Sequence, residues 1–134
     1  MPIPGAAIAL DVGSAKIGIA TSDAGRTMAF PHSTLSRRSV ARDAAAIAAI
    51  AREKGATALV VGLPDAGGRV ERLARQVGEA VAALLTLPAN YVDEGYTSAE
   101  ARLRIADAGM RRDSVDAQAA TLILEEWLRS NAGG

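Results

Sequence analysis

Acidic side chains stand at three places where the surrounding sequence is otherwise apolar. Asp11 interrupts the apolar segment 6–12, and a charge within a central strand is costly unless it is paired or bound to a metal. Asp93 and Glu94 end a second such segment, and Asp116 lies one helical turn before the apolar stripe of the last helix. Carboxylate oxygens that converge from distant segments can bind one or two divalent cations. The pattern predicts a Mg²⁺ or Mn²⁺ site.

Each of these acids also has a purely structural explanation. Asp116 can be stabilised by the dipole at a helix N-terminus. Asp11 can cap the turn at Gly13, and Asp93 and Glu94 can be ordinary residues at a strand end. For these explanations to hold, acids would have to stand at all three places by coincidence, so we favour the metal site.

The composition excludes other kinds of active site. The 134 residues include no cysteine and one histidine, His32. Disulfide frameworks, zinc fingers and thiol nucleophiles are therefore excluded, and one imidazole cannot form a His-rich metal site. We assign His32 no role. The absence of cysteine fits a reducing compartment, and the N-terminal sequence has no charged segment followed by a long apolar one, so we expect a cytoplasmic protein without a membrane span.

The charges of fifteen basic and fifteen acidic side chains cancel, so the protein has no net positive charge that would attract nucleic acid. Any binding of nucleic acid must come from local clusters of basic side chains. Arginine, which suits bidentate contact with phosphate, gathers in three clusters: Arg37, Arg38 and Arg42; Arg69, Arg72 and Arg75; and Arg102, Arg104, Arg111 and Arg112. The alternative is that these arginines merely solvate helix faces.

The elements that position these side chains follow from hydrophobic periodicity and from cap and turn residues. Strands are predicted over 6–12, 16–22, 28–35, 58–63 and 90–93, and helices over 40–54, 69–85, 97–107 and 114–130. Ser39, Thr97 and Ser114 are the expected N-caps, Gly55 is the expected helix stop, and Pro31 indicates an edge or bulged strand.

This order of elements predicts an α/β fold. A hairpin at the start followed by alternating strands and helices favours a single mixed five-stranded sheet with helices on both faces. At this length we expect one domain over residues 1–134.

Two phosphate-binding patterns fit poorly. In the segment 13–18, Ile19 follows Gly18, where a P-loop needs lysine and then Ser or Thr. Asp11 and Gly13 before a hairpin also look like the first phosphate loop of the actin and sugar-kinase ATPases. Those proteins hold nucleotide between two such domains, and this chain has the length of one.

Four motifs together resemble the YqgF/RuvX family: residues 11–23, 60–64, 93–94 and 115–120. Members of that family are similar to ribonuclease H and are regarded as Holliday junction resolvases or as nucleases that trim the 5′ end of precursor 16S ribosomal RNA. The resemblance covers nearly the whole chain and implies a ribonuclease H-like nuclease. It also implies that Asp11, Glu94 and Asp116 are the metal-binding acids, with Asp93 as a further candidate ligand.

The sequence departs from the family pattern at two places. Gly95 stands where the family usually has an arginine after Asp-Glu, and the loop after Pro64 is short, although Gly67 and Gly68 lie in it. The phosphate contact of that family arginine is missing here, and Arg69 and Arg72 lie close to the short loop in sequence, so we expect substrate binding to differ from the family pattern.

We expect a metal-dependent nuclease that binds structured RNA or branched DNA, as a monomer or homodimer. Arg69 and Arg72 follow the loop after the strand 58–63, and Arg112 precedes the helix that carries Asp116. We expect these three arginines to lie beside the acids and, with Lys16, to contact phosphate. The alternatives are a non-catalytic RNA-binding or ribosome-assembly factor with the same fold and, third, an ATPase.

Overall fold

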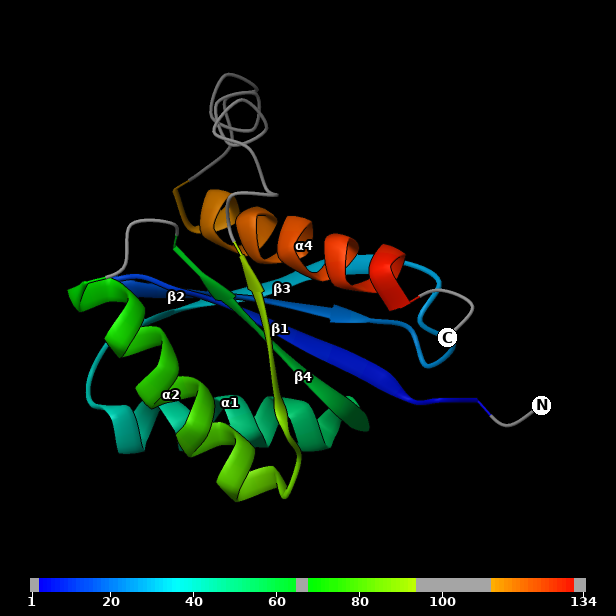
Figure 1. The fold of residues 1–134 in the computed structure, drawn as a ribbon, viewed down its shortest axis with the longest axis horizontal. Coiled ribbons are helices and arrows are strands. Elements are labelled where there is room, and N and C mark those ends of the chain that lie inside the picture. The colour runs from blue at the N-terminus through cyan, green and yellow to red at the C-terminus, as the bar shows by residue number, and fades with distance from the viewer. Residues whose placement is uncertain (1–2, 65–67, 94–111, 132–134) are drawn as a thin grey trace.

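The computed structural model of the protein describes residues 3–64, 68–93 and 112–131 (Figure 1). The described elements are β1 (Ala6–Val12), β2 (Lys16–Ser22), β3 (Ala29–Ser36), α1 (Val40–Glu53), β4 (Ala56–Leu63), α2 (Arg69–Leu85), β5 (Ala89–Asp93) and α4 (Arg112–Asn131). These elements confirm the predicted order, whereas the helix expected over 97–107 lies outside the described residues.

The strands form one mixed sheet with the order β3-β2-β1-β4-β5. β1 pairs in parallel with β4, and β4 with β5, whereas β2 pairs in an antiparallel manner with both β1 and β3. β3 is an edge strand, and its register with β2 shifts between Ser33 and Pro31, which are the partners of Ile19 and Ala20. Both features match the expectation drawn from Pro31, because proline has no N–H to donate to a sheet ladder.

Helices cover both faces of the sheet, as predicted (Figure 1). On one face, Ile8, Leu10 and the other inward residues of β1, β2 and β4 pack against α1 and α2. On the other face, Ala7, Ala9 and Val60 belong to a second core that α4 completes. Side chains along a strand alternate between the two faces, so these two cores fix the direction of every side chain in β1.

The helix ends agree with the sequence signals at α1 but not at α4. Ser39 caps α1, where its Oγ accepts a hydrogen bond of 3.1 Å from the Arg42 N–H, and Gly55 follows the helix with φ of 67°. α4 begins at Arg112, so Ser114 lies inside the helix and the prediction that it is the N-cap is wrong. Arg112 and Asp113 form helix ahead of Ser114, and the acid Asp113 in the first turn complements the helix dipole.

Every helix in the described ranges is too short or too polar to cross a membrane.

Candidate active site

The acidic residues come to one edge of the sheet. β1, β4 and β5 are parallel, so their carboxyl ends, including Asp11 and Asp93, lie at the same edge. α1, α2 and α4 also begin on this side of the molecule (Figure 1). Open α/β sheets bind their ligands at the carboxyl ends of parallel strands, so this edge, where Asp11 and Asp93 stand, is the candidate site.

The start of α4 packs on Gly18, which is the strand partner of Asp11. Asp11 is paired across the antiparallel ladder with Gly18, and directly paired residues project from the same face of a sheet. A Cβ atom built on Gly18 would clash with the carbonyl group of Asp116 and would lie 3.1 Å from the backbone nitrogen of Ala117. The first turns of α4 therefore rest on the bare backbone of β2 opposite Asp11.

Strand alternation gives the same placement for Asp11. Ala7 and Ala9 lie in the core beneath α4, so Asp11, the next residue of that parity, also projects toward α4. Asp11 and Asp116 are both half-buried. The structure thus brings two of the three predicted ligands to one face, at the rim of the apolar core and within reach of solvent.

Lys16 belongs to the same face. It begins β2 two residues before Gly18, so alternation directs it toward the α4 side. The turn that links it to Asp11 is closed by a hydrogen bond of 2.8 Å from the Gly13 N–H to the Lys16 carbonyl oxygen. A cation at this position can contact a phosphate group that approaches the two acids.

Asp93 projects to the opposite side of the sheet. Tyr91 packs against the core under α1 and α2, and Asp93 has the same parity in β5. Alternation therefore separates Asp93 from Asp11 and argues against Asp93 as a ligand. Glu94, the next residue, lies outside the described residues.

The donor chemistry fits a hard divalent cation. The described part of the chain contains no group of three or more His, Cys, Asp or Glu side chains arranged to hold a metal ion. Asp11 and Asp116 supply two carboxylates on one face, and Glu94 is the third acid that the sequence places beside this edge. Carboxylate oxygens are the ligands that Mg²⁺ and Mn²⁺ prefer.

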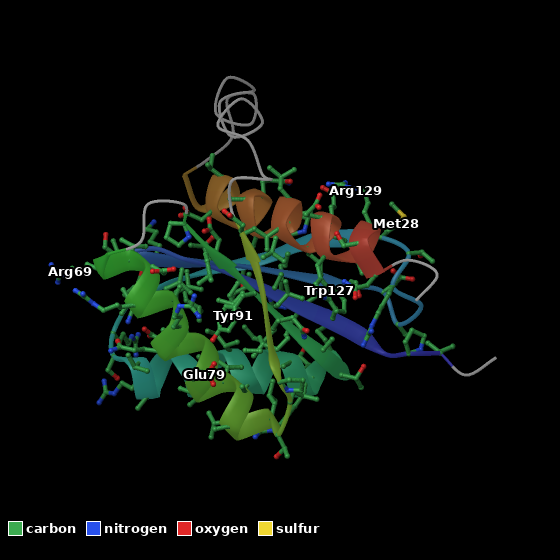
Figure 2. The ribbon with its side chains drawn as sticks, in the orientation of Figure 1. Met28, Arg69, Glu79, Tyr91, Trp127 and Arg129 are labelled. Atoms are coloured by element: carbon green, nitrogen blue, oxygen red, sulfur yellow. The ribbon has the colours of Figure 1, made fainter. Side chains whose placement is uncertain are left out.

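The arginines of α2 divide into two kinds. Arg75 is engaged, because it lies 3.5 Å from Glu71 and 5.0 Å from the centroid of the Tyr91 ring. Arg69 and Arg72, near the start of α2, are exposed, and the ion pairs found among the described residues do not include them. In Figure 2, Arg69 lies at the outer end of α2. Arg112 is the first residue of α4, and its side chain lies outside the description.

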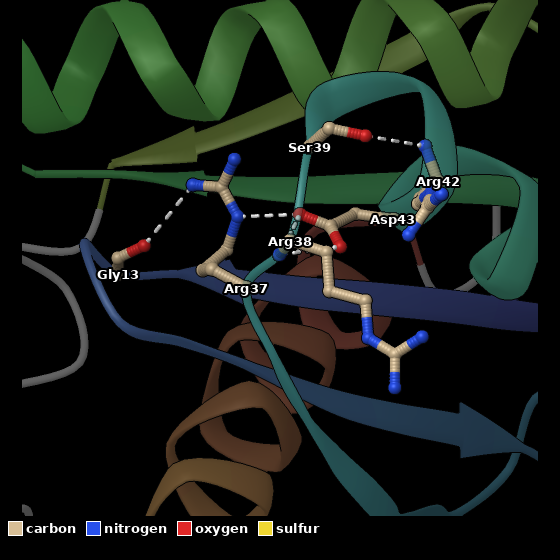
Figure 3. Close-up of polar contacts among 6 residues, drawn as sticks. All are labelled: Gly13, Arg37, Arg38, Ser39, Arg42 and Asp43. Atoms are coloured by element: carbon tan, nitrogen blue, oxygen red, sulfur yellow. Dashed lines mark hydrogen bonds and ion pairs between the residues drawn. The ribbon is translucent and has the colours of Figure 1, made fainter.

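An internal ion pair that the sequence analysis missed fixes the turn after Asp11. Arg37 Nε donates to Asp43 Oδ2 at 2.6 Å, and the two side chains are only 12% and 3% exposed. Arg37 also donates from its guanidinium to the Gly13 carbonyl oxygen at 3.4 Å (Figure 3). Its backbone N–H donates to the Ala15 carbonyl oxygen at 2.8 Å. One signal could have revealed this pair, because Asp43 lies one turn before Ile47 on the apolar stripe of α1.

Asp23 and Tyr91 have shifted pKa values, but both lie apart from Asp11 and Asp116. Backbone hydrogen bonds from Met28 and Thr27 lower the pKa of Asp23, whose carboxylate organises the β2–β3 turn. Burial raises the pKa of Tyr91 to about 12, assisted by its 2.6 Å hydrogen bond to Glu79 on α2. Figure 2 shows Tyr91 and Glu79 together on the α2 side of the sheet.

Comparison with known proteins gives consistent matches. The family model described as RuvX, Holliday junction resolvase, matches residues 5–130. A relative from Frankia casuarinae is 40% identical, covering 94% of this chain and 67% of its own length. One from Thermosynechococcus vestitus is 38% identical, with coverage of 90% and 85%, and both are named as candidate pre-16S rRNA nucleases.

A solved structure shows the fold independently. Thermus thermophilus RuvC, in complex with a Holliday junction substrate, superposes with a TM-score of 0.62 over 96% of both chains at 18% identity. The ribonuclease H-like fold expected from the sequence is thereby confirmed.

Proposed function

The chain belongs to the RuvX family, and we propose that it is a metal-dependent nuclease that hydrolyses phosphodiester bonds in structured nucleic acid. The observation that carries the proposal is the contact of α4 with Gly18, which sets Asp116 against the strand partner of Asp11.

Asp11, Glu94 and Asp116 are the residues that would hold Mg²⁺ or Mn²⁺. When bound, such ions lower the pKa of an attacking water and stabilise the leaving oxygen. The chain would therefore need no histidine or cysteine as a base, in agreement with its composition. The task of Asp11 and Asp116 is to hold their carboxylates in fixed positions on two separate elements.

Lys16, Arg69, Arg72 and Arg112 would hold the substrate. Contacts to phosphates carry no base code, so we propose that the shape of the nucleic acid selects the substrate. The names of the relatives favour a precursor of 16S ribosomal RNA, and the family description favours a Holliday junction. We place the RNA precursor first because the individual relatives, at 40% and 38% identity, carry that name.

Cleavage assays test the proposal directly. The wild-type protein is incubated with an RNA that carries the 5′ extension of 16S rRNA, with a four-way DNA junction and with a linear duplex, in Mg²⁺, in Mn²⁺ or with EDTA. We expect cleavage of the RNA that stops when the metal is chelated. Binding of the RNA without cleavage in either metal would instead support a non-catalytic RNA-binding or assembly factor.

A further inference from the structure

A groove between β3 and the start of α1 carries basic side chains outside the acid site. Its volume is about 550 Å³, and its lining includes Ser36, Arg38, Arg42 and Asp43. We propose that this groove binds the phosphate backbone of the nucleic acid at a distance from the cleavage site. The inference rests on the proposed function and extends the substrate contacts beyond the acids.

The charge of the groove is positive because its one acid is already neutralised. The Asp43 side chain is 3% exposed, and its carboxylate accepts hydrogen bonds from Arg37 Nε at 2.6 Å and from the Arg38 backbone N–H at 3.1 Å. Arg38 and Arg42 are exposed, and neither takes part in the ion pairs found among the described residues. Two guanidinium groups thus remain available at the groove.

Hydrogen bonds fix the backbone at Arg38 and at Arg42. The Arg38 backbone is fixed by Asp43, and the Arg42 backbone N–H donates to the Ser39 cap. Figure 3 shows the Arg38 side chain extending away from the Asp43 carboxylate. Because the anchoring bonds use backbone atoms, the side chains can be changed without removing those bonds.

The groove lies at the same edge of the sheet as the acids. β3 is antiparallel to β2, as β1 is, so the carboxyl ends of β1 and β3 share one edge. Arg37, next in sequence to Arg38, bonds to the carbonyl oxygens of Gly13 and Ala15 in the turn that follows Asp11. Asp11 projects toward α4, whereas the groove is lined by α1. A strand bound at Asp11 would therefore reach the groove by passing over this turn at the edge of the sheet.

Nucleic acid is the occupant that fits these groups. Guanidinium groups bind phosphate oxygens bidentately, and the Ser36 hydroxyl offers a further donor. Ala45 and Ala46 in the lining are small, so a sugar-phosphate backbone can approach closely. A nucleic acid has regularly spaced phosphates, so it can contact both arginines and also reach the sheet edge that carries Asp11, whereas an isolated anion cannot.

The test measures affinity against salt for a labelled structured RNA, in Ca²⁺ to suppress cleavage. The double variant Arg38→Ala/Arg42→Ala is compared with Lys54→Ala/Arg129→Ala, which removes the same charge from the far ends of α1 and α4. Each lost phosphate contact should lower the slope of log affinity against log salt by about 0.7 to 0.9. We expect a loss of about 1.4 to 1.8 in the groove variant and no change in the control.

A charge-preserving variant refines the test. Arg38→Lys/Arg42→Lys should keep the wild-type salt slope, since the two charges remain. Equal slopes of log affinity against log salt for the groove variant and the wild type would overturn the inference. If the wild type still cleaves RNA in that case, the nuclease proposal stands without the groove. Loss of slope in the groove variant of a protein that binds but never cleaves would support the groove and contradict the nuclease.

Discussion

Replacing Gly18 by alanine tests the geometry of the candidate site. The added Cβ would clash with the Asp116 carbonyl group, which is backbone and cannot rotate away. The start of α4 must then lift from β2, and Asp116 must move away from Asp11.

The size of the effect follows from contact distances. Carbon and oxygen atoms in proteins pack at roughly 3.5 Å or more, so α4 has to retreat by on the order of 1 Å. Overpacking of this kind destabilises a fold by about 1–3 kcal/mol. A displacement of about 1 Å in a catalytic group lowers the rate by about 10²-fold, which we expect for Gly18→Ala together with weaker Mn²⁺ binding.

The assay combines single-turnover cleavage with calorimetric titration of Mn²⁺, at a temperature where the melting curve shows the variant to be folded. Gly25→Ala is the matched control. Its Cβ would meet the side chain of Asp23 at 3.3 Å in the β2–β3 turn. This turn follows the end of β2 that is opposite Lys16 and the turn after Asp11. We expect Gly25→Ala to behave as the wild type in both measurements. Wild-type cleavage and Mn²⁺ affinity in Gly18→Ala would show that the contact of α4 with Gly18 does not set the position of Asp116 for catalysis.

Three further predictions concern individual contacts. Asp43→Ala leaves the Arg37 charge buried without its partner and should destabilise the fold by about 3–5 kcal/mol in urea unfolding, and a loss below about 1 kcal/mol would contradict the ion pair. Tyr91 has a pKa raised from 10.0 to about 12 in the folded protein, so the stability that its proton contributes is complete below pH 10 and is lost as the pH rises through about 12. Tyr91→Phe should remove the step near pH 12 from a spectrophotometric titration, whereas an unchanged titration would contradict the assignment. Arg69→Ala should lower the salt slope of RNA binding by about 0.7 to 0.9, and an unaltered slope would place this arginine outside the interface.

Much of the fold was predictable because its signals are local. Alternating Ile17 and Ile19 predicted β2, the uncharged segment 58–63 predicted a strand covered on both faces, and Ser39 predicted the start of α1. Asp11 was conspicuous for the same reason, since a charge within an apolar strand stands out without any knowledge of its neighbours.

The contacts that assemble the site could not be predicted, because they join segments far apart in the chain. Nothing around Gly18 indicates that the backbone at Asp116 will pack on it. The opposite directions of Asp11 and Asp93 follow from strand pairing rather than from residue type. Ser114 lies inside α4, which shows that a residue with a good capping side chain does not by itself fix where a helix begins.

Single-turnover cleavage of the RNA precursor by Asp116→Asn in Mg²⁺ shows whether the Asp116 carboxylate takes part in the reaction. Asparagine keeps the shape of the side chain and removes its charge, so the melting curve should remain close to that of the wild type. Metal ions contribute several kcal/mol to such reactions, and we predict that the cleavage rate falls by at least about 10²-fold. Cleavage at the wild-type rate by the folded variant would contradict the claim that Asp116 serves the active site.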